Sequence, residues 1–224
     1  MEIVNILNFI LQYLEKELIP RFLKIIISPW LHKEALWLVI PLIVILFFIE
    51  AYFGRNKTEQ IGWNTAFGNA VSLFWISVLL FKFLVENNLV NNTFYYTQLK
   101  GLILVIILFS WSLVLLVSDY FHALSKKIAF LISSVIPVNV TAYIFISIIV
   151  GKIPIDKTTI LASISLFIIT ILFFTLFKFM ISPSETAEKM IEKKKRKERI
   201  IKERKKEERR KKIQELKSKI LKKI

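Results

Sequence analysis

Long apolar runs separated by short polar stretches dominate the first 181 positions of the chain. Crossing the hydrocarbon core of a bilayer takes about 20 residues of apolar helix. Runs close to that length cover residues 35–53, 65–85, 102–118, 128–150 and 160–180. A membrane barrel would instead show alternating polarity in strands of about 10 residues. The pattern therefore predicts an all-α fold, a polytopic membrane helix bundle of about five transmembrane helices within residues 34–181.

The first 33 residues have a different pattern. Polar side chains recur every three or four positions, which gives an otherwise apolar helix one polar stripe. The charged residues 15–17 would make spanning costly, and Pro20 should bend or break the helix. We expect residues 1–33 to form an amphipathic helix that lies in the membrane interface or packs on the bundle.

The last part of the chain, residues 182–224, is very basic. From Pro183 onward it holds 19 Lys and Arg against 8 Glu and no further Gly or Pro. Its residues are good helix formers, and Glu–basic pairs spaced by four, such as Glu192 with Arg196 and Glu198 with Lys202, support a helix. The Ser182-x-x-Glu185 spacing, with Pro183 at the first helical position, resembles a capping box. We expect a long helix surrounded by water.

A dense row of cations attracts polyanions, either nucleic-acid phosphates through counterion release or anionic lipid headgroups. The alternative is a solvated spacer with no specific partner. Aromatic residues are absent after Phe179, so contacts with nucleic acid would be to the backbone. The candidate polyanion-binding residues are Lys193, Lys194, Lys195, Arg196, Lys197, Arg199, Lys202, Arg204, Lys205, Lys206, Arg209, Arg210, Lys211 and Lys212.

In design, this tail is similar to the basic helical tails of membrane insertases of the YidC type. That resemblance implies the ribosome as a partner. The hairpin after the first span and the intramembrane arginine of that family are missing here, so the resemblance does not extend to the bundle.

The end of the tail carries a short apolar stripe at helical spacing. This stripe could pair with another copy as a coiled coil, dock on a partner or lie on lipid. Its members are Ile213, Leu216, Ile220 and Ile224.

Basic residues near the span ends predict the orientation, because cytoplasmic loops are enriched in Lys and Arg. The loops after the first and third runs carry two basic residues each, and the tail lies on the same side. We expect a multi-pass protein of the cell membrane with a cytoplasmic C-terminus. The exceptions to the rule are Arg21, Lys24 and Lys33, which would lie outside.

Polar residues within the apolar runs are the other candidate functional residues, namely Glu50, Asn69, Asp119, His122 and Asn139. A carboxylate–histidine pair could move protons or hold a metal, but snorkelling and pairing with Arg55, Lys126 or Lys127 is the favoured interpretation. Asparagines in spans commonly hydrogen-bond across helices. Alternatively, they line a polar pathway, with Pro137 and Asn139 marking a broken helix.

Composition excludes several kinds of chemistry. The 224 residues are 55% hydrophobic, carry a net charge of +15 and include no cysteine, which rules out disulfides and thiol chemistry. The motifs of phosphate-binding loops, serine hydrolases and zinc proteases are absent. The Ile-, Lys- and Glu-rich composition is typical of thermophiles, archaea among them, or of an AT-rich genome. We expect no cofactor, no metal and no enzymatic activity.

Three functions remain in competition. The first is a membrane anchor or scaffold whose basic helix binds a polyanion, either ribosomal RNA or anionic lipid. The second is a small channel or transporter subunit with Asn69, Asn139 and Asp119 on its pathway and the tail as an assembly element. The third and least favoured is an intramembrane enzyme that uses Glu50, Asp119 and His122.

Overall fold

The computed structural model describes residues 2–57, 62–91 and 96–221, and throughout these ranges all regular structure is helical. Side chains are not described for residues 2–4, 9–10, 87–91, 96–98 and 209–221. Five segments are long and apolar enough to cross a membrane, which confirms the predicted polytopic bundle. They are formed by α3 (Lys33–Arg55), α4 (Trp63–Asn91), α5 (Tyr96–Tyr120), α6 (Lys126–Ile132) with α7 (Val135–Val150), and α8 (Lys157–Met180).

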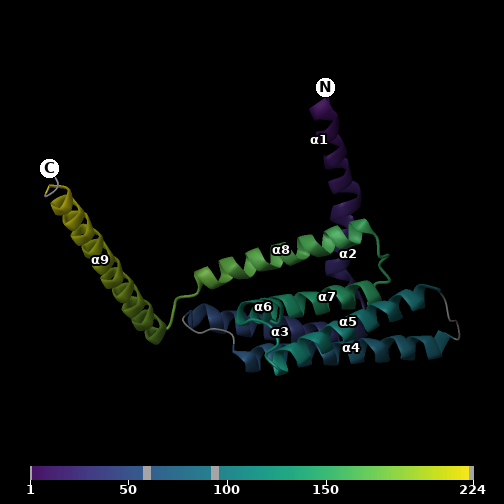
Figure 1. Cartoon of the computed structure of the whole chain (residues 1–224). Helices are drawn as coiled ribbons and strands as arrows, with labels where there is room; N and C mark the ends of the chain where they lie inside the picture. Colours follow the sequence, from purple (N-terminus) through teal and green to yellow (C-terminus); the bar gives the residue numbers. More distant parts are fainter. Residues whose placement is uncertain (1, 58–61, 92–95, 222–224) are drawn as a thin grey trace.

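The spans run side by side, with α4 and α5 forming an antiparallel hairpin (Figure 1). The core lies between α3, α4, α5 and α7, where side chains such as Val39, Leu73, Leu108 and Ile146 are almost completely buried. Large apolar side chains on the outside, such as Trp37 at 83% exposed, face the region that lipid would occupy. Lipid contact therefore follows from the architecture.

The last span, α8, is the least buried of the five. It packs against α2 near its beginning and against α3 near its end. At the α3 end, Phe47 makes edge-on contacts with Phe173, Phe174 and Phe177, with ring centroids 5.1–6.1 Å apart. Aromatic pairs in this arrangement contribute about 0.5–1.5 kcal/mol each beyond burial.

The N-terminal segment is helical and is not among the five candidate spans found in the described residues. It consists of α1 (Glu2–Tyr13), a π-helical stretch (Leu14–Leu18), α2 (Ile19–Ile27) and a 3₁₀ turn (Ser28–Leu31). Figure 1 shows α1 running across the direction of the spans, while α2 reaches the bundle. The α2 part packs on the bundle, because Ile25 is completely buried, whereas Leu7 and Leu11 on α1 are more than half exposed. That α1 lies in the membrane interface stays a prediction.

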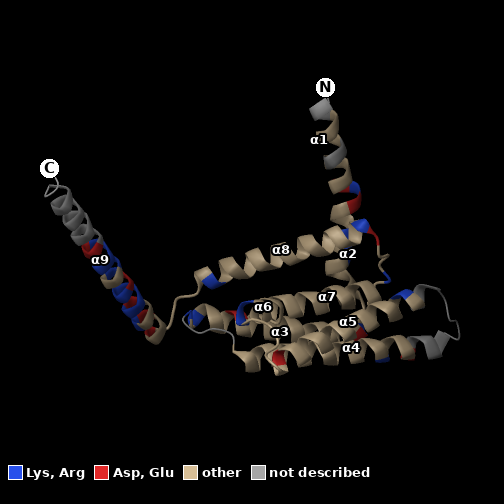
Figure 2. Cartoon of the chain, viewed as in Figure 1, with Lys and Arg blue, Asp and Glu red and all other residues tan. Residues whose placement is uncertain are grey.

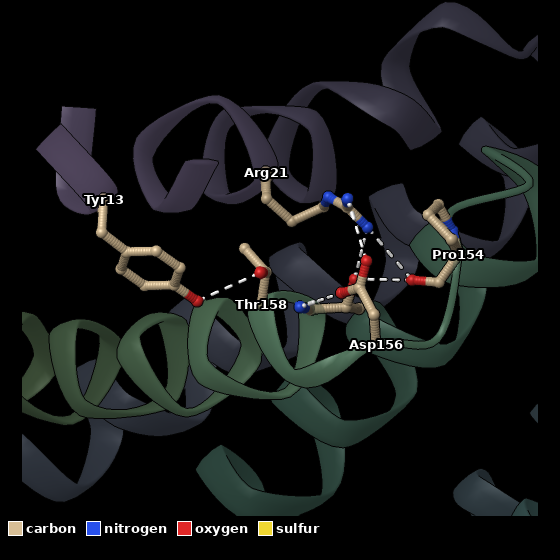
Figure 3. Close-up of polar contacts among 6 residues, drawn as sticks. Tyr13, Arg21, Pro154, Asp156 and Thr158 are labelled. Atoms are coloured by element: carbon tan, nitrogen blue, oxygen red, sulfur yellow. Dashed lines mark hydrogen bonds and ion pairs between the residues drawn. The ribbon is translucent and has the colours of Figure 1, made fainter. Parts of the chain in front are cut away.

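The N-terminal segment is fixed to the beginning of α8 and to the residues just before it (Figure 3). Arg21 pairs with Asp156 at 3.1 Å and donates a hydrogen bond to the Thr159 hydroxyl at 2.7 Å, and the Tyr13 hydroxyl lies 3.0 Å from that of Thr158. Partial burial opposes ionisation of Asp156, but hydrogen bonds from Thr159 and the Arg21 guanidinium together hold its pKa below the ordinary 3.8. Arg21, an exception to the charge rule, therefore has a partner.

The C-terminal helix α9 (Glu185–Leu221) leaves the bundle as a single long rod, and Figure 2 shows that Lys and Arg are far denser on it than on the spans. Its first residue is Glu185 rather than the expected Pro183, and its N-cap is Ser184 rather than Ser182. The Ser184 hydroxyl lies 3.3 Å from the Ala187 backbone nitrogen, which donates to it. The capping-box prediction was therefore wrong by two positions, because Ser184 also receives support from the bundle.

Candidate functional site: one end of the bundle

The end of α3, the end of α8 and the beginning of α9 meet at one end of the bundle. Glu50 of α3 is buried, and its carboxylate lies 2.5 Å from the Lys178 ammonium in the last turn of α8. One turn further along α3, Gly54 allows close approach, since a Cβ there would lie 2.8 Å from the Ile181 side chain. The Ser184 backbone N–H then donates to the Arg55 carbonyl at 2.9 Å.

Glu50 therefore has a different partner from those expected. The sequence interpretation offered Arg55, Lys126 or Lys127, whereas the structure pairs it with Lys178. A signal for this pair was present, because Lys178 stands within an apolar run, where a charged side chain requires a partner. The pair joins the first span to the last.

Asp119 lies at the same end, in the last turn of α5, in a different environment. It is 2% exposed, and neither carboxylate oxygen has a hydrogen-bond partner among the described residues. The Ser133 side chain lies beside it, and its hydroxyl oxygen is likewise buried without a well-formed hydrogen bond. Unsatisfied polar atoms of this kind are rare in native structures and costly, at about 1–3 kcal/mol each.

Ser133 belongs to a break in the fourth span. Helix α6 ends at Ile132, the backbone is extended at Ser134, and α7 begins at Val135 without a side-chain cap at its N-terminus. The break precedes Pro137, which sits in the first turn of α7, where proline is tolerated. A broken helix was considered at Pro137 and Asn139, and the actual break lies three residues earlier.

The break is held from the neighbouring hairpin. The Asn69 side chain of α4 donates to the Ser133 carbonyl at 2.8 Å, so an intramembrane asparagine satisfies a carbonyl freed by the break. His122, just after α5, has a left-handed backbone (φ 51°) and stacks on Trp63 with ring centroids 4.1 Å apart. The imidazole is exposed and lies close enough to act electrostatically on Asp119.

Asn139 does not join this group. Its amide nitrogen donates to the Val135 carbonyl of its own helix at 2.8 Å, whereas a hydrogen bond to another helix was expected. It lines an apolar cavity of about 290 Å³ between α2, α3, α7 and α8, together with Trp30, Leu46, Tyr143, Leu166 and Thr170. The Tyr143 hydroxyl at this cavity accepts from the Trp30 indole and donates to the Ile26 carbonyl.

The described part of α9 exposes its basic side chains. From Glu192 to residue 208 every side chain is exposed, and neither Glu192 with Arg196 nor Glu198 with Lys202 forms an ion pair. The expected intrahelical ion pairs are therefore not formed in this described part of the helix. The side chains of Arg209, Arg210, Lys211, Lys212, Ile213, Leu216 and Ile220 lie outside the described residues, as does Ile224.

Of the intramembrane candidates, the structure brings Asn69, Asp119 and His122 to one place, puts Glu50 in an ion pair and leaves Asn139 at the cavity. Among the described residues, no three His, Asp or Glu side chains are grouped to hold a metal ion. Ser133 and Lys178, both absent from the sequence-based candidates, complete these two arrangements.

Taken together, the fold and these sites define a polytopic helical membrane protein with a protruding basic helix. No protein-family model, curated protein or solved structure matches the chain.

Proposed function

We propose that the protein is a membrane-anchored scaffold whose helix α9 binds a polyanion on the cytoplasmic side, with ribosomal RNA as the favoured partner. The observation that carries the proposal is the exposure of the basic side chains between Lys193 and Lys206, unpaired by glutamate, on a helix that stands away from the bundle (Figure 2). Such a surface supplies phosphate contacts whose affinity comes from counterion release.

The distribution of charge around α9 favours RNA over a lipid surface. A helix that lies on a membrane has an apolar face that enters the acyl region. Between Lys193 and residue 208, the apolar side chains are only Ile200 and Ile201, both adjacent and exposed, and cations occupy the remaining sides. A rod that is basic on most sides suits contact with phosphates that approach from several directions.

The attachment of α9 suits a scaffold. The backbone and hydroxyl of Ser184 bond to Arg55 and Asn56 at the end of α3, and Ala187 in the first turn is 2% exposed. Because the first turn of α9 is docked on the end of α3, a force applied to α9 is transmitted directly to the first span. A flexible linker between them would absorb it.

The test is co-sedimentation of the detergent-purified protein with ribosomes over a salt series. Replacing residues 193–197 by glutamine keeps the helix propensity but removes five cations. The slope of log affinity against log salt should then fall by up to about 4 units, since each lost phosphate contact contributes about 0.7–0.9.

A matched control changes the charge in the opposite direction. Replacing Glu192, Glu198 and Glu203 by glutamine should tighten binding at the same salt. Equal binding by both variants and the unmodified chain would sink the proposal. Binding to vesicles of anionic phospholipid but not to ribosomes would identify lipid headgroups as the partner instead.

The proposal includes a cytoplasmic C-terminus and the lack of an enzymatic activity. With α9 in the cytoplasm, the loops that carry Arg55, Lys57, Lys126 and Lys127 are cytoplasmic as well, in agreement with the charge rule. Arg21 would then lie outside, where its pairing with Asp156 offsets its positive charge. Self-association through Ile213, Leu216, Ile220 and Ile224 remains a prediction.

A second candidate function is a small channel or transporter subunit. The convergence of Asn69, Asp119 and Ser133 at a broken span favours it, because transporters commonly place their ion sites at interrupted helices. Proteoliposome flux assays would test it. Replacing Asn69 by leucine should reduce flux and leave ribosome binding unchanged, and flux insensitive to that change would remove this candidate.

A further inference from the structure

Three buried oxygen atoms at the break in the fourth span lack a well-formed hydrogen bond. They are the two carboxylate oxygens of Asp119 and the hydroxyl oxygen of Ser133, on residues 2% and 0% exposed. They come from two different spans and lie side by side. A buried carboxylate without a partner is far costlier than a buried hydroxyl, so the group needs positive charge from elsewhere.

The surrounding helices do not supply that charge. On α4 the charged residues are Lys82 and Glu86, towards the opposite end, and α7 has none. Lys126 and Lys127 stand exposed at the beginning of α6, and His122 is exposed on Trp63. Glu50, the other buried carboxylate at this end, does have a cation beside it, because the Lys178 ammonium lies 2.5 Å from its carboxylate oxygen.

The donor set matches one kind of ligand. Carboxylate and hydroxyl oxygens are ligands of hard cations. A single carboxylate balances a single positive charge, and no group of three or more His, Asp or Glu side chains occurs among the described residues, which argues against a divalent ion. The break adds the free peptide groups of a helix end, which transporters use to bind sodium ions and protons.

We propose that Asp119 and Ser133 form a binding site for a monovalent cation, a sodium ion or a proton, at the break between α6 and α7. The site deepens the second candidate function by naming its ion and does not depend on α9. His122, exposed and stacked on Trp63, marks the side from which the ion enters.

The experiment uses the full chain in nanodiscs of neutral lipid and measures equilibrium binding of radioactive sodium at acidic and neutral pH. Infrared difference spectra of the same samples detect a protonated carboxyl group. Asp119→Asn should abolish saturable sodium binding, and Ser133→Ala should weaken it about tenfold, because one coordinating oxygen atom is removed. Glu50→Gln is the matched control, because that carboxylate already has Lys178.

Each outcome decides the proposal. Sodium binding that depends on Asp119 identifies sodium, and a protonated-carboxyl band at neutral pH that disappears in Asp119→Asn identifies a proton. Neither signal, or equal sodium binding in Asp119→Asn and the unmodified chain, overturns the proposal. If Asp119→Asn does not fold, Ser133→Ala decides, and unchanged binding and band in that variant contradict it. Ribosome binding by α9 would be unaffected in every case.

Discussion

Two carboxylates lie buried at the same end of the bundle, and the structure treats them differently. Glu50 on α3 is held by Lys178 on α8, beside the docked first turn of α9. Among the described residues, no lysine or arginine pairs with Asp119 on α5, which faces the break between α6 and α7. Glu50 and Asp119 are both buried carboxylates, so the difference lies in the partner. With Lys178, Glu50 forms a structural cross-link, whereas Asp119 is left able to take a ligand.

The difference matters because a buried ion pair is costly to break but contributes little when compared with an apolar pair. Glu50 and Lys178 therefore fix which helices lie together more than how stable the bundle is. Asp119, in contrast, has neither an ion pair nor a hydrogen-bond partner for either carboxylate oxygen among the described residues, which leaves it able to take a ligand.

The largest expected effect comes from Lys178→Met. This change leaves Glu50 buried without a partner and should lower the free energy of unfolding by about 3 kcal/mol. The figure is at the low end of the range for buried pairs because the Lys178 side chain is 37% exposed. Denaturant unfolding in detergent micelles would measure it.

A matched control for this change is Lys82→Met. Lys82 and Glu86 form a pair at 3.6 Å in which both side chains are mostly exposed, so its loss should cost under about 1 kcal/mol. The double variant Glu50→Gln with Lys178→Met should recover most of the loss. Equal effects of the two lysine changes would contradict the assigned role of the Glu50–Lys178 pair.

Neutralising Glu50 and neutralising Asp119 should have smaller effects on the free energy of unfolding, and these two effects should be opposite in sign. Glu50→Gln should cost about 1–2 kcal/mol, because a charge-assisted interaction with Lys178 is lost. Asp119→Asn should leave stability unchanged or raise it by up to about 1 kcal/mol in sodium-free buffer, because an unpartnered charge is removed. Thermal unfolding with and without sodium would show this, and sodium should stabilise only the chain that retains Asp119.

The smallest effect concerns a third carboxylate, Asp156, which is partly exposed at the opposite end and pairs with Arg21. Its pKa is lowered in the folded protein, so its contribution is fully present above the ordinary value of 3.8 and disappears as the pH falls through the lowered value. Below about pH 4 the unmodified chain should therefore lose melting temperature faster than Asp156→Asn. Parallel curves would show that this contact does not stabilise the N-terminal segment.

The sequence was sufficient for the spans because each run is mostly apolar and close to bilayer length, and the structure extends the runs by only a few residues. Contacts between distant segments were harder to predict. Three spans lie between Glu50 and Lys178 in the chain, and only packing brings the two side chains together. The sequence gives no signal that marks Ser133 as a site residue, because the hydroxyl of a serine within an apolar run usually donates to a carbonyl of its own helix.

Helix α9 shows the opposite limit. Its helicity and charge follow from composition alone, but its starting residue depended on tertiary contacts. Ser184 was selected over Ser182 because the Arg55 carbonyl and the Asn56 side chain lie within hydrogen-bonding distance of it.

Both buried carboxylates and the beginning of α9 lie at one end of the bundle, and we assign that end to the cytoplasm. The chain has no cysteine, so single cysteines can be introduced at Lys195 on α9 and at Lys152 in the loop before α8 without background. In intact cells, a membrane-impermeant maleimide should label the cysteine at 152 and not the one at 195, and lysis should expose both. Labelling of position 195 in intact cells would contradict the assignment and, with it, binding of a cytoplasmic polyanion.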